Sequence, residues 1–205
     1  MLTEKSSANP DEILISSPEK TVIASEWVAR WLAPRKAGRL LDFACGSGRH
    51  ARWAADRGHR VLAIDRDAVA LERLHGERRP LIDIRVEDLE SGPWHLEGLS
   101  FDAIVCTNYL FRPRLALMLA LLAPGGIWIH ETFAVGNEAY GRPRNPEFLL
   151  REGELLSWAR LAGLQVIAYE SGLVEQPAPA VIQRIAAIRS HQAQPLVQAM
   201  AQGPV

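Results

Sequence analysis

The chain has 205 residues, of which 48% are apolar and 23% are charged. At roughly 100–200 residues per domain, this length predicts a single domain, and the apolar fraction excludes a wholly disordered chain. The 23 basic residues nearly balance the 24 acidic ones, with a formal net charge of −1, so there is no overall positive field with which to bind nucleic acid or an anionic membrane.

The chain shows no pattern typical of a targeting or membrane-spanning segment. Residues 1–9 are polar and lack the apolar core of a signal peptide. The longest apolar run, Leu115–Ala123, has nine residues, whereas a membrane span needs about 20. Cys45 and Cys106 have no zinc-type spacing, so we expect two small buried side chains in a reducing compartment. The expected location is therefore the cytoplasm, with no membrane partner.

The predicted elements begin with a loose segment over residues 1–16 and a helix over residues 17–33. Ser17 suits the N-cap, Pro18 suits the first turn, and Pro34 ends the helix. From residue 39 onward, strands alternate with helices, and a tight turn is predicted at 124–126. The predicted strands are 39–44, 60–65, 82–86, 101–107, 127–132, 164–171 and 181–188, and the predicted helices are 48–57, 67–75, 113–122 and 153–161.

This alternation predicts right-handed βαβ units and a parallel sheet with helices on both faces. No helix fits into the link over residues 172–180, so the last two strands are expected to be antiparallel neighbours. The predicted fold is a Rossmann-like, doubly wound α/β sheet of seven strands, mostly parallel, with an antiparallel last strand. Its core covers residues 39–189 of a single domain, 1–205, and residues 190–205 are predicted to form a loose tail.

The segment Leu40–His50, LLDFACGSGRH, leads from an apolar strand through a glycine-rich turn into a helix. Gly46 and Gly48 allow the backbone to approach a ligand closely, and the start of the helix offers free N–H groups to a negative group. The spacing Gly46-x-Gly48-x-x-Ala51 also fits the dinucleotide fingerprint. A nicotinamide or flavin cofactor therefore stays open on glycine spacing alone.

Acidic residues at the ends of three successive strands favour a different ligand. Asp42 would repel a pyrophosphate but suits the cationic groups of S-adenosylmethionine, and its alternative role is to cap the loop by accepting backbone N–H groups. Asp65 can accept both ribose hydroxyls of an adenosyl group, which suits either cofactor. Asp88 can accept from the adenine amino group while the N–H of Leu89 bonds to the ring, and its alternative is a solvated loop acid.

In this order and spacing, DFACGSGRH, AIDRD, EDLE, FDAIVCTNYL and LLAPGGIWIHETF resemble the successive motifs of class I S-adenosylmethionine-dependent methyltransferases. The resemblance extends from residue 27 to residue 189. It is nearest to small bacterial enzymes of the tellurite-resistance and thiol-methyltransferase-like kind, in which a long loop leads into a stretch similar to Phe148–Leu155. Ala44 departs from the pattern, because it stands where the family has its first glycine.

The resemblance implies S-adenosyl-L-methionine as the cofactor and a set of cofactor-binding residues at the ends of the first four strands. By this resemblance the glycine turn holds the methionine end, the second strand end holds the ribose and the third holds the adenine. Asn108 lies where the methyl donor meets the acceptor. The implied cofactor-binding residues are Asp42, Ala44, Gly46, Gly48, Asp65, Arg66, Asp88, Leu89 and Asn108.

The acceptor is expected beyond the C-terminal ends of the fourth and fifth predicted strands, because ligands of open parallel sheets bind there. The long loop over residues 133–150 contains glycine and proline and is predicted to fold over this opening. Two arginines, Arg142 and Arg144, lie near Tyr140 in this loop and suggest an anionic or carboxylate-bearing acceptor.

Methyl transfer needs in-line alignment and exclusion of water, and needs a base only for an acceptor that is protonated. The catalytic candidates are Asn108, Tyr140 and His130, although a histidine inside a strand belongs to the core more often than it acts in catalysis. Glu131 is a further candidate for the base alone. The histidines show no metal-ligand spacing, so no metal is expected.

We therefore predict a methyltransferase that uses S-adenosylmethionine, acts on a small-molecule acceptor and is a monomer or homodimer. One alternative is a nicotinamide-dependent oxidoreductase, against which Asp42 and the lack of room for a substrate domain argue. Another is a protein that binds the cofactor without turnover. A nucleic-acid acceptor is not expected, because there is no basic domain and residues 107–110 lack an Asn/Asp-Pro-Pro-Tyr/Phe motif.

Overall fold

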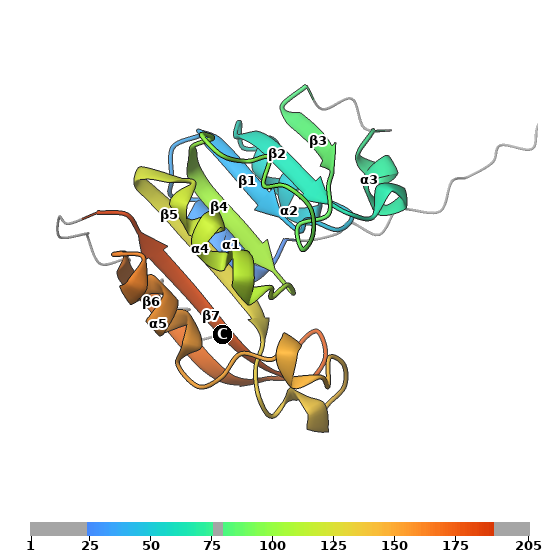
Figure 1. Ribbon diagram of the computed structural model, residues 1–205, viewed down its shortest axis with the longest axis vertical. Coiled ribbons are helices and arrows are strands. Elements are labelled where there is room, and N and C mark those ends of the chain that lie inside the picture. The colour runs from blue at the N-terminus through green and yellow to red at the C-terminus, as the bar shows by residue number, and fades with distance from the viewer. Residues whose placement is uncertain (1–23, 76–79, 191–205) are drawn as a thin grey trace, which may run out of the picture.

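The structure, a computed structural model, describes residues 24–75 and 80–190. Its strands form one seven-stranded sheet in the order β3-β2-β1-β4-β5-β7-β6 (Figure 1). The strands are β1 (Arg39–Phe43), β2 (Arg60–Asp65), β3 (Ile82–Val86), β4 (Phe101–Thr107), β5 (Leu122–Phe133), β6 (Gln165–Val174) and β7 (Ala180–Ile188). The helices are α1 (Glu26–Leu32), α2 (Arg49–Ala55), α3 (Ala68–His75), α4 (Arg112–Ala120) and α5 (Glu154–Leu161), with short 3-10 turns η1 (Asn137–Ala139) and η2 (Pro146–Phe148).

The first five strands are parallel, whereas β7 is antiparallel to both of its neighbours, β5 and β6. This confirms the predicted sheet, with its antiparallel last strand. The strand order reverses between β1 and β4, because the chain leaves β1 toward β2 on one side and later returns to β4 on the other. The loops that leave these two strands diverge, and in doubly wound sheets ligands bind at such a point, beyond the C-terminal strand ends.

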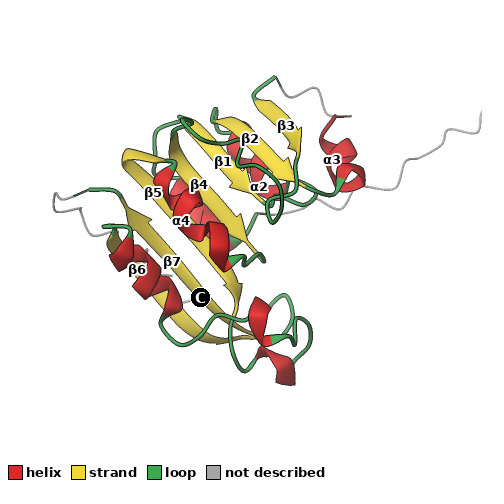
Figure 2. Ribbon diagram, viewed as in Figure 1, coloured by secondary structure: helices red, strands yellow, loops and turns green. Residues whose placement is uncertain are grey.

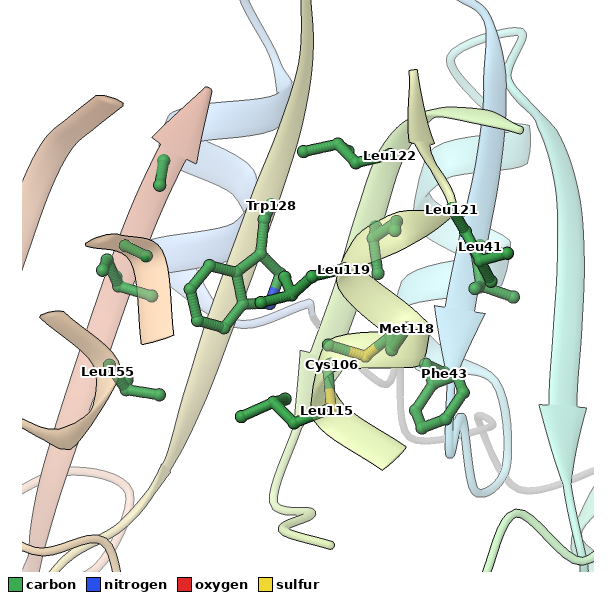
Figure 3. Close-up of a cluster of buried hydrophobic side chains, with 14 of the residues drawn as sticks. Leu41, Phe43, Cys106, Leu115, Met118, Leu119, Leu121, Leu122, Trp128 and Leu155 are labelled. Carbon is green, nitrogen blue, oxygen red and sulfur yellow. The ribbon is translucent and has the colours of Figure 1, made fainter. Parts of the chain in front are cut away.

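Helices cover both faces of the sheet (Figure 2). Alternate strand residues point to opposite faces, so in β1 Leu40 packs with α1, α2 and α3 while Leu41 packs with α4 and α5. Figure 3 shows part of the second cluster, where Met118 and Leu119 of α4 lie over the sheet residues Cys106 and Trp128. The described part of the chain has no helix with the length and apolarity that crossing a bilayer requires.

The two cysteines match their prediction. Cys45 and Cys106 are both buried, and neither forms a disulfide. Burial raises the pKa of each thiol above its ordinary value, so both side chains remain protonated and contribute to packing as small apolar groups.

The first helix begins later than predicted. Residues up to 23 lie outside the described part of the chain, but the predicted helix also covered Ala24 and Ser25, and there the prediction is wrong because α1 begins at Glu26. Ser25 has an extended backbone with ψ 135°. Its N–H donates to His50 Nε2 at 3.2 Å and its hydroxyl to Glu131 at 2.9 Å, so both of its polar donors bond to distant elements.

The turn predicted at residues 124–126 lies inside β5 and not before it. Leu122 pairs with Phe101 of β4, and pairing resumes between Ile127 and Ala103, so the intervening residues bulge from this ladder. Gly125 has φ 77°, a conformation that favours glycine, and its N–H donates to the Arg189 carbonyl at 2.8 Å. The strand therefore extends further toward its N-terminal end than hydrophobicity alone predicted.

Candidate active site

Two adjoining cavities lie at the C-terminal edge of the parallel strands. The first cavity is lined by Ala44, Asp65, Arg66, Asp88, Leu89, Glu90 and Tyr109. The second cavity is lined by Glu90, Asn108, Tyr109, Leu110, Thr132, Phe133, Pro143 and Phe148. Because Glu90 and Tyr109 line both, ligands in the two cavities would meet beside these two residues.

The turn after β1 contains three residues with positive φ, namely Ala44 at 56°, Gly46 at 54° and Gly48 at 74°. A Cβ atom on Gly46 would meet nothing within 4 Å, whereas one on Gly48 would lie 2.4 Å from the Leu74 side chain of α3. Gly46 therefore leaves open space beside the turn, and Gly48 permits close packing of α3. Ala44 lines the first cavity in a conformation that costs a residue with a side chain about 1–2 kcal/mol.

Asp65, the last residue of β2, joins the glycine turn to the start of the next helix. Its Oδ2 accepts the Gly46 N–H at 2.7 Å, and its Oδ1 accepts the Asp67 N–H at 2.9 Å. Each carboxylate oxygen keeps a further lone pair with which it can accept a hydroxyl group. The side chain thus stands at the first cavity, next to the glycine turn, as the predicted ribose contact requires, and that contact stays a prediction.

Asp88 has both of the roles considered for it, since it bonds within its own loop and also lines the first cavity. Its Oδ2 accepts the Ser91 hydroxyl at 2.7 Å and its Oδ1 accepts the Glu90 N–H at 2.8 Å. These hydrogen bonds, that of Ser91 first, lower the pKa of Asp88. A charged acceptor is therefore held in place beside Leu89, where adenine is expected.

Asp42 is buried behind the turn and lines neither cavity. Its side chain is 1% exposed, and Oδ2 accepts the Ala51 N–H in the first turn of α2 at 2.9 Å. Burial raises the pKa of Asp42 to about 7, although the Ala51 hydrogen bond partly opposes this shift. The observed hydrogen bond is thus the one expected for the alternative role of Asp42, in which it caps the loop by accepting a backbone N–H. A direct or water-mediated contact with the methionine amine stays a prediction.

A partly buried polar network lies at the C-terminal ends of β4 and β5, and the hydrogen bonds that join its residues could not be predicted from the sequence. His50 Nε2 accepts the Ser25 N–H, so its Nδ1 carries the proton and faces Thr107 Oγ1 at 3.5 Å. Burial lowers the pKa of His50 to about 3, which keeps the ring neutral. Glu131 accepts the Ser25 hydroxyl and pairs with Arg184 of β7 at 3.4 Å. The available signals were the position of His50 directly after the glycine turn and those of Thr107 and Glu131 at predicted strand ends.

Of the three catalytic candidates, the structure brings Asn108 to the second cavity and leaves the other two outside both cavities. Asn108 has φ 54°, and its N–H donates to the Glu131 carbonyl at 2.9 Å. His130 is 0% exposed, its Nε2 lies 3.1 Å from the Tyr109 carbonyl, and burial lowers its pKa to about 4. Tyr140 is 49% exposed beside η1.

The loop after β5 reaches the second cavity, as predicted, through Pro143 and Phe148, and Phe133 at the end of β5 also lines it. The two arginines that suggested an anionic acceptor, Arg142 and Arg144, are exposed and are not among its lining residues. Of the described residues that line this cavity, Glu90 alone carries a formal charge at neutral pH. The structure therefore does not support an anionic acceptor.

The acceptors of the first cavity suit an adenosyl group. Asp65 and Asp88 offer carboxylate oxygens for ribose hydroxyls and an adenine amino group. The open space beside Gly46 leaves the backbone accessible to the methionine end of such a ligand. The residues present thus fit S-adenosylmethionine.

Comparison with known proteins supports this assignment. The methyltransferase domain family matches residues 40–126. A probable S-adenosylmethionine-dependent methyltransferase from Mycolicibacterium smegmatis is 31% identical, over 73% of this chain and 63% of that protein. The tRNA U34 carboxymethyltransferase of Alcanivorax borkumensis is 30% identical, over 71% of this chain and 52% of that protein. The chain spans about half the length of most curated relatives that it matches.

Solved structures share the fold. TehB from Haemophilus influenzae superposes with a TM-score of 0.64 at 17% identity, covering 79% of this chain and 60% of that one. The 1,6-didemethyltoxoflavin-N1-methyltransferase of Burkholderia thailandensis, which holds S-adenosylhomocysteine, superposes with a TM-score of 0.59 at 21% identity, covering 80% of this chain and 75% of that one. The domain match and the curated relatives favour a methyltransferase over a nicotinamide-dependent oxidoreductase, and in sequence and fold the chain is similar to class I S-adenosylmethionine-dependent methyltransferases.

Proposed function

We propose that this chain transfers a methyl group from S-adenosylmethionine to a small molecule that binds in the second cavity. The observation that carries the proposal is the boundary shared by the two cavities, where Glu90 and Tyr109 line both. A cofactor bound through the first cavity can present its methyl group across this boundary. A compact acceptor in the second cavity is then within reach.

The residues contribute binding, orientation and exclusion of water. Asp65 accepts the ribose hydroxyls, Asp88 accepts from the adenine amino group, and Gly46 leaves room for the methionine end. When bound, the cofactor supplies an electrophilic methyl group on a sulfonium sulfur. Leu110 and Phe148 belong to a largely apolar wall of the second cavity, which excludes water and aligns the acceptor with the methyl group.

The substitution Asp65→Ala tests the cofactor site. It removes the charged acceptor of the ribose and is expected to weaken binding of S-adenosylhomocysteine by about 1–3 kcal/mol. Calorimetric titration of the folded variant measures this loss. The matched control is Asp67→Ala, because Asp67 is an exposed acid two residues away that bonds the Ala70 N–H and lines neither cavity.

The two possible failures of this experiment are distinct. If the parent protein is folded but shows no heat and no thermal shift with either S-adenosylmethionine or S-adenosylhomocysteine, the proposed activity is wrong. If the parent binds and Asp65→Ala binds equally well, the activity stands and only the ribose assignment is wrong.

A tRNA acceptor is the second candidate function, because several curated relatives are named tRNA U34 carboxymethyltransferases. The net charge of −1 and the acids Asp65, Asp88 and Glu90 beside the cavities argue against a polyanionic partner. Filter binding with total tRNA at low salt distinguishes the candidates. The small-molecule proposal expects no binding, and an affinity that falls linearly with the logarithm of salt concentration would favour tRNA.

A further inference from the structure

The second cavity combines a largely apolar lining with one carboxylate. Its apolar residues are Leu110, Phe133, Pro143 and Phe148, and its uncharged polar residues are Asn108 and Thr132. A carboxylate beside an apolar ligand is costly unless the ligand supplies a hydrogen-bond donor or a positive charge. The chemistry of Glu90 therefore bears directly on the class of acceptor.

Glu90 is held in place by its backbone but has a weakly engaged side chain. Its N–H donates to Asp88 Oδ1 at 2.8 Å, which fixes the loop. Its Oε2 lies 3.8 Å from Arg66 Nη1, beyond hydrogen-bonding distance. The two side chains are 34% and 68% exposed, so solvent screens this ion pair and it contributes little. The Glu90 carboxylate is thus available to a ligand at the boundary of the two cavities.

Tyr109, the other residue at the boundary, does not compete for this role. Its hydroxyl is buried and has no hydrogen-bond partner among the described residues. Burial first, and then the negative charge of Glu90, raise the pKa of Tyr109, so the phenol stays neutral. Tyr109 therefore lines the cavities with its ring, a surface suited to an aromatic or cationic ligand.

The surrounding charges disfavour an anionic nucleophile. Asp65, Asp88 and Glu90 all line the first cavity, and Glu90 continues into the second. A thiolate, phenolate or carboxylate acceptor would bring another negative charge beside Glu90 and would be repelled. An amine or a heterocyclic N–H would instead donate to Glu90 while its apolar body fills the rest of the cavity.

From these contacts we infer that Glu90 binds the acceptor through an N–H group, and that the acceptor is a small amine or N–H heterocycle with an aromatic or apolar body. This inference rests on the proposed function. The nitrogen lone pair attacks the methyl carbon, the carbon–sulfur bond breaks, and its electron pair stays on sulfur to give S-adenosylhomocysteine. The methylated nitrogen then releases one proton to Glu90, which passes it to water, and the product is an N-methylated amine.

The experiment uses probes that share one body and differ in the reacting group: benzylamine, benzyl alcohol, benzyl mercaptan and benzoate, with tryptamine and benzimidazole as further N–H donors. Each is titrated calorimetrically into the complex with S-adenosylhomocysteine, and each is incubated with S-adenosylmethionine for detection of methylated product by mass spectrometry. We expect at least one N–H probe to bind about tenfold more tightly than the alcohol, thiol and carboxylate.

Two substitutions at the boundary provide the critical comparison. Glu90→Gln removes the charge at nearly constant size and is expected to reduce the preference for amine over thiol about tenfold. Arg66→Gln removes a nearby positive charge that repels a protonated amine and is expected to strengthen amine binding, an effect that a damaged fold would not produce. The matched control is Glu97→Gln, an exposed acid of the same loop that lines neither cavity.

Each outcome decides between the proposals. If S-adenosylhomocysteine binds but no N–H probe does, or if the amine preference is unchanged in both boundary variants, the inference is overturned while the proposed function stands. If S-adenosylhomocysteine does not bind to the folded parent, the proposed function falls, and the inference with it.

Discussion

Two residues of the turn after β1, Gly46 and Gly48, are expected to need glycine for different reasons. Gly46→Ala places a methyl group in open space at positive φ, so we expect about 1–2 kcal/mol of lost stability and a clear loss of cofactor affinity. Gly48→Ala adds the same strain and also forces Leu74 to move, so a loss of about 2–4 kcal/mol is expected. Urea unfolding and calorimetry on both variants test this. A larger affinity loss in a folded Gly48→Ala than in Gly46→Ala would contradict the assignment.

The raised pKa of Asp42 is expected to make the stability of the fold depend on pH. Its carboxyl group has an ordinary pKa of 3.8, and burial raises the pKa in the folded state to about 7. Between these values the folded protein binds a proton that the unfolded chain has released, so this group's contribution to stability falls as pH rises from about 4 to 7.

The substitution Asp42→Asn removes this effect and keeps a carbonyl oxygen for the Ala51 N–H. We expect the variant to gain stability over the parent progressively from pH 4 to pH 7, reaching about 1–3 kcal/mol at pH 8. Urea unfolding at a series of pH values measures the difference. A difference that is independent of pH would show that Asp42 is charged throughout.

At the scale of elements, Arg112 at the start of α4 holds the wall of the second cavity. Its Nε and Nη2 donate to the Glu154 carboxylate at 2.7 and 2.8 Å, its Nη1 to the Glu147 carbonyl at 2.6 Å, and its Nη2 also to the Leu149 carbonyl at 2.8 Å. The Glu154 hydrogen bond raises the pKa of Arg112. These bonds join α4, η2 and α5, and η2 carries Phe148 into the cavity.

The substitution Arg112→Lys keeps the charge but loses the planar fork. We expect about 1–3 kcal/mol of lost stability and weaker acceptor binding, with S-adenosylhomocysteine affinity unchanged because Arg112 does not line the first cavity. The control is Arg160→Lys, an exposed arginine of α5. Equal loss of cofactor and acceptor affinity would mean that Arg112 supports the fold in general and not this wall.

For the whole molecule, buried histidines predict sensitivity to acid. Burial lowers the pKa of His50 to about 3 and that of His130 to about 4, from an ordinary 6.5, and it lowers that of His59 as well. Below pH 6.5 the unfolded chain takes up protons that the folded protein does not, so stability is lost as pH falls from about 6.5 toward 4. Over the same pH range, Asp42 adds stability as pH falls, but it is one group against three histidines.

We expect the urea midpoint to decrease from pH 7 to pH 4 in the parent and to decrease more steeply in Asp42→Asn, where the opposing group is absent. A midpoint that rises on acidification would show that the histidines are not the dominant groups.

The class of fold and its antiparallel last strand could be predicted from the sequence, and so could a cofactor site at the strand ends, which stays a prediction. Each of these features depends on residues that are close together in the chain. They are the alternation of apolar strands and helices, the glycine turn, and the acids Asp65 and Asp88 at strand ends. The N-terminal start of α1 and the bulge around Gly125 were predicted incorrectly, since hydrogen bonds to remote segments decide both.

Which side chains reach the cavities depends on contacts between remote parts of the chain and could not be predicted from the sequence. His130 and Thr132 point to the same face of β5 and both are buried, but only Thr132, nearer the end of the strand, lines the second cavity. The junction of Glu90 with Tyr109 depends on how the loops after β3 and β4 pack against each other. The hydrophobic pattern of a strand predicts the face of the sheet to which a residue points. The distance of that residue from a ligand depends on strand register and loop packing, which involve parts of the chain far apart in sequence.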